Sequence, residues 1–254
     1  MVLAIDIGNT NIVIGCFEGD RILFVERVAT NHRATDLEYA SIIRTALHIH
    51  GRESSLIDGA IISSVVPALT GTVRRAIEKY AGVGVIVVGP GIKTGLSIRT
   101  DDPAELGADL VVDAVAGVNN YRVPQIIIDM GTATTFSVID KNKNYAGTLI
   151  TTGMSISSEA LSASTSQLPR VGFEKPSAVI GKNTVDSMRA GIMYSNAAAI
   201  DGICDRIEEE LGEKCTVIAT GGLSSVVTSL CKRSIILDET LMLKGLMLIY
   251  NKNK

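Results

Sequence analysis

A short pattern that occurs twice constrains the fold of this chain more than any other feature. Residues 3–10 read Leu-Ala-Ile-Asp-Ile-Gly-Asn-Thr, and residues 126–133 read Ile-Ile-Ile-Asp-Met-Gly-Thr-Ala. Each copy is an apolar run that ends in Asp-x-Gly and is followed by small hydroxyl or amide residues. Such runs are typical of buried strands that leave the core at a turn. The duplication predicts two similar halves that face each other across a cleft.

The turn after each strand has the chemistry of a phosphate site. Asp6 corresponds to Asp129, and Gly8 corresponds to Gly131. Glycine lacks a Cβ and can adopt positive φ, so backbone N–H groups can approach a phosphate. Carboxylate oxygens suit Mg²⁺. Either copy alone also fits an ordinary strand-to-turn junction, but two copies favour a site for a nucleoside triphosphate and its metal ion.

Composition excludes several classes of function. Of 254 residues, 46% are hydrophobic, 20% are charged and 4% are aromatic, and the net charge is −3. Lysine and arginine are scattered without a basic stripe, so we expect no nucleic-acid partner. The apolar runs are too short to span a bilayer, and no basic segment precedes the first one. We therefore expect no membrane association and a cytoplasmic location. The four cysteines form no C-x-x-C pair, and we expect them to be reduced.

The hydrophobic periodicity predicts an α/β protein in which the order β-β-β-α-β-α occurs twice. The expected strands are 2–7, 11–17, 21–28, 59–64, 83–88, 125–129, 134–140, 145–151 and 216–219. The expected helices are 36–50, 66–80, 153–165, 184–211, 222–231 and 239–251, with a long joining helix that begins near Pro103. We expect two domains, 1–118 and 119–254.

The segment between the repeats offers a candidate base. Asp109 and Asp113 are four residues apart and share one face of the expected helix. Phosphoryl transfer needs a positioned group that accepts the proton of the substrate hydroxyl. The alternative is that both are solvated helix carboxylates. Gly107 favours Asp109, because a glycine inside a helix costs about 1 kcal/mol and indicates a close approach by another group.

Four motifs together resemble the type III pantothenate kinase family, within the actin/hexokinase/Hsp70-like ATPase superfamily. They are Asp-Ile-Gly-Asn-Thr-Asn at 6–11, Gly-Ala-Asp at 107–109, Asp-Met-Gly-Thr-Ala-Thr at 129–134 and Gly-Lys-Asn-Thr at 181–184. The resemblance covers essentially the whole chain. It implies two ribonuclease H-like (actin-like ATPase) domains and ATP-dependent phosphorylation of pantothenate to 4′-phosphopantothenate, the first step of coenzyme A biosynthesis. It also implies a homodimer with the substrate site near its interface.

The resemblance assigns roles to individual residues. Asp109 would be the catalytic base, Asp129 would bind a monovalent cation (K⁺ or NH₄⁺), and Asp6 would lie near phosphate-bound Mg²⁺. The ATP-binding residues would be Asp6, Ile7, Gly8, Asn9, Thr10, Asn11, Ile12, Val13 and Thr132. The pantothenate-binding residues would be Gly107, Ala108, Asp109, Leu110 and Thr184. Gly221 and Gly222 resemble an adenosine-side turn, although a plain loop before a helix fits them nearly as well.

The chain departs from the family pattern in two places. The family has arginine directly after the catalytic aspartate, where this chain has Leu110. Arginine is a permanently charged, bidentate partner for a carboxylate, and leucine is not. Arg99 and Arg189 are candidate replacements. The family's Pro-Gly after the third strand of the second half is Thr152-Gly153 here, which retains the glycine.

Two other functions stay open at this point. A divergent, non-enzymatic accessory or regulatory paralogue would keep the same fold, and Leu110 is the feature that favours it. A kinase or phosphatase of the same superfamily with another substrate is the second, because fold alone does not fix the reaction. The presence of Asp6, Asp109 and Asp129 favours the pantothenate kinase.

Overall fold

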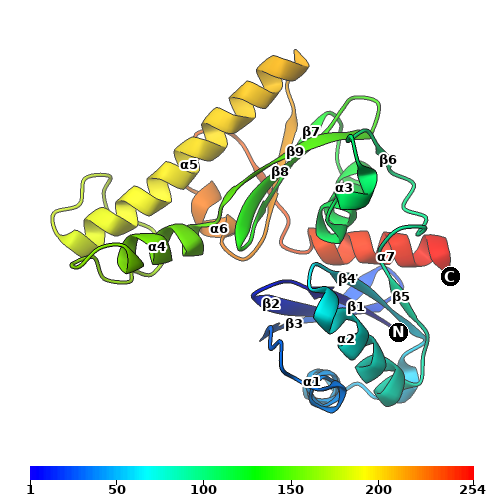
Figure 1. Cartoon of the computed structure of the whole chain (residues 1–254). Helices are drawn as coiled ribbons and strands as arrows, with labels where there is room; N and C mark the ends of the chain where they lie inside the picture. Colours follow the sequence, from blue (N-terminus) through cyan, green and yellow to red (C-terminus); the bar gives the residue numbers. More distant parts are fainter. The chain divides into compact units, whose positions relative to one another are not determined.

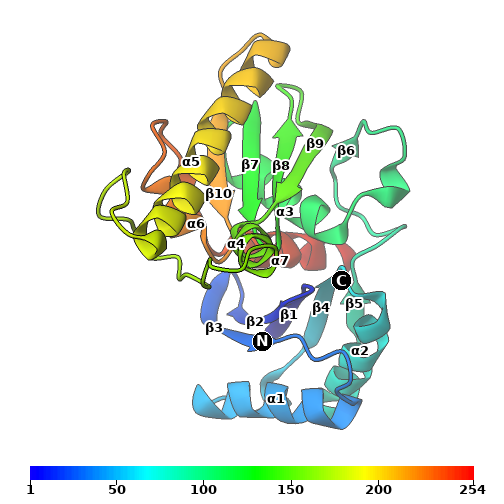
Figure 2. The same ribbon diagram turned by 60° about the vertical axis from the view of Figure 1, so that its left-hand side comes forward.

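The computed structural model describes residues 1–254, which form two compact units (Figures 1 and 2). Unit 1 comprises Met1–Gly95, Asp102–Ala116 and Leu241–Lys254, and unit 2 comprises Leu96–Asp101 and Gly117–Thr240. This division differs from the expected domains 1–118 and 119–254. The C-terminal segment belongs with unit 1 because its helix packs on the first sheet.

Unit 1 contains a five-stranded sheet in the order β3-β2-β1-β4-β5. The strands are β1 (Val2–Ile7), β2 (Asn11–Glu18), β3 (Arg21–Ala29), β4 (Gly59–Ser64) and β5 (Val85–Val87). Strands β1, β2 and β3 are antiparallel neighbours, whereas β4 is parallel to both β1 and β5. The ends of β1 and β4 therefore lie together at one edge, with Asp6 paired with Ser63.

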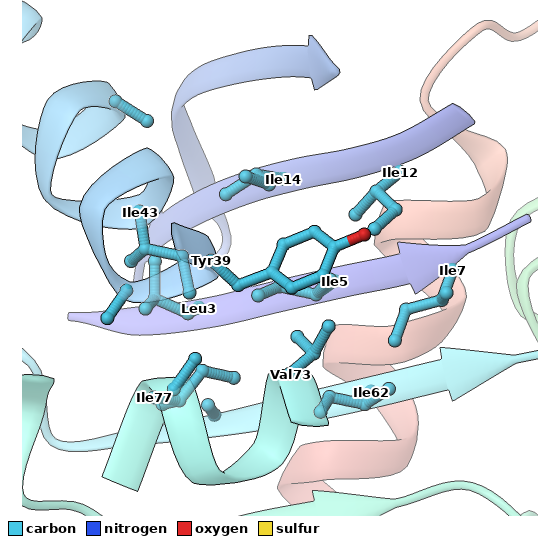
Figure 3. Packing of buried hydrophobic residues seen from close by; sticks show 14 of the residues in the cluster. Leu3, Ile5, Ile7, Ile12, Ile14, Tyr39, Ile43, Ile62, Val73 and Ile77 are labelled. Atoms are coloured by element: carbon cyan, nitrogen blue, oxygen red, sulfur yellow. The ribbon is translucent and has the colours of Figure 1, made fainter. Parts of the chain in front are cut away.

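Two helices cover one face of this sheet, α1 (Asp36–Ile49) and α2 (Pro67–Ala81). Thr35 and Glu38 form a capping box at the start of α1, and Pro67 begins α2, where its missing N–H costs nothing. Alternate residues of β1 enter the core beneath these helices. Figure 3 shows Leu3, Ile5 and Ile7 packed with Ile43, Val73 and Ile77, among others.

Unit 2 repeats the plan of unit 1. Its sheet has the order β11-β10-β7-β8-β9-β6, so the first five strands correspond one by one to β5-β4-β1-β2-β3. The strands are β6 (Ser97–Ile98), β7 (Gln125–Met130), β8 (Ala133–Ile139), β9 (Asn144–Thr152), β10 (Thr216–Thr220) and β11 (Ile236–Leu237). The equivalence of β1 and β7 confirms the internal repeat that the duplicated pattern predicts.

The core of unit 2 lies on one face of β7, β8 and β10. Its helices are α4 (Met154–Ala163), α5 (Thr184–Leu211) and α6 (Ser224–Thr228). Ile126, Ile128 and Met130 of β7 pack with Met193 and Ile200 of α5. In Figure 2, α5 runs alongside β10 and β7. No helix of the structure is both long enough and apolar enough to cross a bilayer.

Helix α3 (Ala108–Asn120) differs from its expected bounds. Pro103–Glu105 form a short 3₁₀ turn, and the α-helix begins only at Ala108. Gly107 therefore precedes the helix, and the inference drawn from a glycine inside a helix is wrong. The two-residue strands β6 and β11 were not expected, because two residues carry no periodic signal.

Helix α7 (Leu241–Asn253) covers the second face of the unit 1 sheet. A Cβ on Gly15 would meet the Leu243 side chain at 2.9 Å, and one on Gly59 would overlap the Tyr250 hydroxyl. Gly15 of β2 lies beside Ala4 of β1, and Gly59 of β4 lies beside Val2, so α7 crosses β1 obliquely as it passes from the Asp6 end of the strand toward its start. Its N-terminus therefore lies toward the end of β1 that carries Asp6.

The same helix also packs on α3 within unit 1. A Cβ on Gly245 would overlap the backbone carbonyl oxygen of Val112, so the two helices touch at their backbones. Helix α7 is therefore the common neighbour of β1, which carries Asp6, and of α3, which carries Asp109. In unit 2, a Cβ on Gly117 of α3 would meet the side chains of Gln125 and Ile127 of β7.

We predict that Gly245→Ala destabilises the protein by about 1–3 kcal/mol, because the added methyl has no space against rigid backbone. Thermal or urea unfolding measures the effect. Gly71→Ala in α2 is the matched control, since a Cβ there meets only the flexible end of Arg75. The control should be neutral or stabilise by up to about 1 kcal/mol. Equal effects of the two changes would contradict the backbone contact between α7 and α3.

Candidate active site

The first candidate phosphate turn joins β1 to β2. The Gly8 N–H donates to the Asn11 carbonyl at 3.0 Å, and a Cβ on Gly8 would lie 3.0 Å from the same oxygen. Gly8 has negative φ, so the turn needs its missing Cβ and not left-handed backbone. Asn9 and Thr10 are exposed at the tip of this turn.

The second candidate turn joins β7 to β8 and is enclosed by three glycines. The Gly131 N–H donates to the Ala133 carbonyl at 3.0 Å, and the Gly153 N–H donates to the Thr132 carbonyl at 3.1 Å. A Cβ on Gly153 would lie 2.5 Å from the Gly131 carbonyl oxygen. Gly153 is thus required at this turn, which explains why the Thr152-Gly153 departure retains the glycine.

Gly221 packs against the same turn from the end of β10. It has φ +93°, and a Cβ there would lie 2.5 Å from Asp129 Oδ1 and 2.6 Å from the Met130 nitrogen. It follows β10, whose last residue Thr220 pairs with Asp129. From the sequence, Gly221 fits either an adenosine-side turn or a plain loop before a helix. A plain loop before a helix does not require this contact with Asp129.

Each strand-end aspartate has a buried hydroxyl in register beside it. Ser63 pairs with Asp6 across the parallel β1–β4 ladder, and Thr135 pairs with Asp129 across the antiparallel β7–β8 ladder. Paired residues project from the same face of a sheet. Neither Ser63 Oγ nor Thr135 Oγ1 has a hydrogen-bond partner in the structure. Both hydroxyls therefore retain the capacity to bind water or an oxygen-liganded cation next to a carboxylate.

This donor set fits hard cations. No group of three His, Cys, Asp or Glu side chains in the structure could hold a metal ion, so any cation would share its ligands with a substrate. Mg²⁺ in phosphate-transfer sites is held by one or two carboxylates together with substrate phosphates. Single carboxylates at Asp6 and Asp129, each beside an unpartnered hydroxyl, match that requirement.

Asp109 lies at the second position of α3, within unit 1. The Leu110 N–H donates to Asp109 Oδ1 at 2.8 Å, and a Cβ on Gly107 would overlap the same oxygen. Burial raises the pKa of the Asp109 carboxyl, while the backbone N–H donors oppose that shift. A carboxylate with a raised pKa is a stronger base. Asp113 is only 1% exposed, so the alternative of two solvated carboxylates is wrong.

Leu110 is a buried apolar residue that is 7% exposed. No charge therefore stands at the position where the resemblance leads us to expect arginine. Arg189, one candidate replacement, is paired with Glu174 at 2.8 Å and Asp186 at 3.8 Å. Arg99, the other candidate, has an exposed side chain in unit 2, and its backbone N–H donates to the Tyr145 carbonyl.

Thr184 is the first residue of α5, in unit 2. Asn183 caps the helix by accepting from the Asp186 N–H at 2.9 Å. Thr184, Lys182 and Met188 line a groove of about 600 Å³ at this helix N-terminus. Helix N-termini favour anions because their N–H groups are not used within the helix. The groove thus combines apolar walls with a positive end.

The predicted residues are divided between the two units, and within unit 2 only Asp129, Thr132 and Gly221 meet at one turn. Unit 1 holds the Asp6 turn and the Asp109 helix, joined through α7, and unit 2 holds Asp129, Thr132, Gly221 and Thr184. Sequence reasoning missed Ser63, and it named Thr135 only as one of the hydroxyl residues that follow the second copy of the pattern. The only signal for Ser63 is that the apolar run of β4 ends in hydroxyl residues, which is common in proteins.

Comparison with known proteins places these motifs in one family. A family model described as type III pantothenate kinase matches residues 2–206. A type III pantothenate kinase from Bacillus cytotoxicus is 44% identical over 253 residues, covering 100% of this chain and 97% of that protein. One from Halalkalibacterium halodurans is 43% identical over 253 residues and covers 100% of both chains.

Solved structures support the class of fold. The activator of the 2-hydroxyisocaproyl-CoA dehydratase from Clostridium difficile, with bound ADPNP, has a TM-score of 0.56 to this chain. The match covers 98% of this chain and 93% of that one, at 14% identity. At this identity the likeness concerns the fold alone, and it agrees with the predicted α/β class with two similar domains.

We predict that the Asp109 carboxyl titrates above its ordinary value of 3.8, since burial penalises the charged form. Carboxyl ¹³C chemical shifts followed against pH measure this pKa. The resonance is assigned by its loss in Asp109→Asn. A titration at or below 3.8 would show that the N–H donors outweigh burial.

Proposed function

The chain belongs to the type III pantothenate kinase family, and from this premise we propose how its residues divide the work of the reaction. The reaction is transfer of the γ-phosphoryl group of ATP to the hydroxyl of pantothenate, which gives 4′-phosphopantothenate and begins coenzyme A biosynthesis. The observation that carries this function is the full-length similarity to pantothenate kinases at 43–44% identity, with Asp6, Asp109 and Asp129 all present.

The two turns would hold the nucleotide. We assign residues 6–13 to the phosphates and Thr132 to ATP. This assignment is supported by the exposed tip at Asn9 and Thr10 and by the three glycines around the Asp129 turn. Phosphoryl transfer depends mainly on such positioning and on neutralisation of charge.

Asp109 would accept the proton of the pantothenate hydroxyl as that oxygen attacks the γ-phosphorus. Its raised pKa supports the role, because a base works best with a pKa near the operating pH. The hydrogen bond from the Leu110 N–H fixes the orientation of the carboxylate. Residues 107–110 and Thr184 would bind pantothenate.

Cations and assembly complete the proposal. Asp6 would lie near phosphate-bound Mg²⁺, and Asp129 would bind K⁺ or NH₄⁺. When bound, these ions neutralise the charge that develops on the phosphates. Their support is the oxygen-only donor set and the unpartnered hydroxyls of Ser63 and Thr135. The homodimer and the cytoplasmic location stay predictions that rest on the family resemblance and on composition.

The accessory paralogue has less support. Its favouring feature is Leu110, a single substitution, whereas both turns keep their aspartate in the same place of the repeated sheet. A protein released from catalysis has no need to keep a half-buried carboxylate at Asp109, because burial without function costs stability.

The proposed function is tested by ADP release with Mg-ATP, with and without pantothenate, in potassium and in sodium buffer. We expect pantothenate-dependent turnover that potassium stimulates. Asp109→Asn should lower kcat by about 10²–10⁴-fold while ATP binding, measured by calorimetry, is retained. Near wild-type kcat in this variant would refute Asp109 as the base. Intact ATP binding without turnover in the wild type would favour the accessory paralogue.

A second prediction concerns Leu110. If this residue lines the pantothenate site, Leu110→Arg should lower KM for pantothenate by about tenfold, since a charge-assisted hydrogen bond to the substrate carboxylate becomes available. Leu110→Met, which conserves volume without charge, should leave KM unchanged. Thermal unfolding of both variants checks that the buried position tolerates the change. An unaltered KM in a folded Leu110→Arg variant would place Leu110 outside the substrate site.

A further inference from the structure

Thr30 holds both ends of the first phosphate turn. Its hydroxyl Oγ1 donates to the Gly8 carbonyl at 2.7 Å, and its backbone N–H donates to the Thr10 carbonyl at 2.9 Å. Thr30 directly follows Ala29, the last residue of β3, which pairs with Asn11. One residue just after the third strand thus bonds the carbonyls on either side of Asn9.

These two bonds determine where the turn directs its donors. The peptide unit is planar, so the carbonyl of one residue and the N–H of the next point in opposite directions. Fixing the Gly8 carbonyl toward Thr30 therefore directs the Asn9 N–H away from Thr30. Asn9 is exposed, so a ligand can reach this part of the turn.

Thr30 is itself anchored through its neighbour. The Tyr39 hydroxyl of α1 donates to the Asn31 carbonyl at 2.9 Å and accepts from the Asn31 N–H at 3.2 Å. The Asn31 side chain accepts from the Arg33 N–H at 3.0 Å. Figure 3 shows the Tyr39 ring between Ile5 and Ile14, and Tyr39 is 2% exposed. The series of contacts that leads from Thr30 through Asn31 to Tyr39 therefore ends in the rigid core.

We propose that Thr30 is a positioning residue for the phosphates of ATP, acting through Gly8 and Thr10 without touching the nucleotide. The proposal rests on the proposed function only in that this turn binds ATP. Preorganised backbone donors lower the cost of ordering a loop when the ligand binds. Loss of the Thr30 hydroxyl should therefore weaken the binding of ATP more than it weakens the binding of pantothenate.

The test compares Thr30→Val, Thr30→Ser and Thr45→Val. Valine keeps the shape of threonine and removes the hydroxyl, and serine retains the hydroxyl. Thr45→Val is the matched control, because the Thr45 hydroxyl bonds only to the Ser41 carbonyl of its own helix. Calorimetry with magnesium and a non-hydrolysable ATP analogue gives Kd, and steady-state assays give KM for ATP and for pantothenate.

We expect Thr30→Val to raise Kd and KM for the nucleotide by about five- to tenfold, with KM for pantothenate unchanged. Thr30→Ser should lie near the wild type, and Thr45→Val should match it. An unchanged nucleotide Kd in Thr30→Val overturns the proposal. So does a rise in both KM values that Thr45→Val shares, since that would indicate general loss of stability.

The two proposals fail in different ways. A wild-type protein that binds the nucleotide analogue but does not phosphorylate pantothenate refutes the proposed function, and the Kd comparison still decides the role of Thr30. Tyr39→Phe tests the anchor. Its effect on Kd should be smaller than that of Thr30→Val and should not add to it in the double variant, because both act through one chain of contacts. Full additivity would contradict the anchor.

Discussion

The alternation of side chains along β1 and β7 is the constraint on which the rest of the structure depends. In β1, Leu3, Ile5 and Ile7 enter the core beneath α1 and α2, and so Asp6 must project from the opposite face. In β7, Ile126 and Ile128 do the same beneath α5, which turns Asp129 to the other side. A shift of one residue would bury both carboxylates in apolar cores, where an unpaired charge is very costly. The register of each sheet therefore places a carboxylate outside the apolar core, at the end of its central strand.

Much of the fold could be predicted because its long elements are strongly periodic. The bounds of β1 and α5 agree with expectation, 2–7 and 184–211, since apolar spacing, capping residues and terminal glycines act together there. The start of α3 could not be predicted from Pro103, because a proline opens a 3₁₀ turn as readily as an α-helix. The packing of α7 on the sheet of unit 1 could not be predicted from the sequence either. It depends on Gly15 and Gly59, more than 180 residues earlier, and pairing over that distance leaves no local pattern.

The candidate site divides in the same way. Asp6, Asp129 and Asp109 could be found because each belongs to a short motif in which neighbouring residues carry the signal. Ser63 and Thr30 could not, because their roles arise from register or from hydrogen bonds to a distant turn. Serine and threonine are frequent at the ends of strands for other reasons. What matters at these positions is the partner across the sheet, which one sequence without its pairing does not reveal.

The return of α7 to the first sheet has a consequence for synthesis on the ribosome. Strands β1 to β4 are complete by Ser64, yet the helix that covers their second face begins at Leu241. At about 5–20 residues per second, translation takes roughly ten seconds or more to reach it. Through that interval the face around Gly15 and Gly59 has no cover from its own chain. The nascent protein thus carries an unfinished N-terminal unit until its last helix emerges, and any chain released early would keep that apolar surface open to chaperones and proteases.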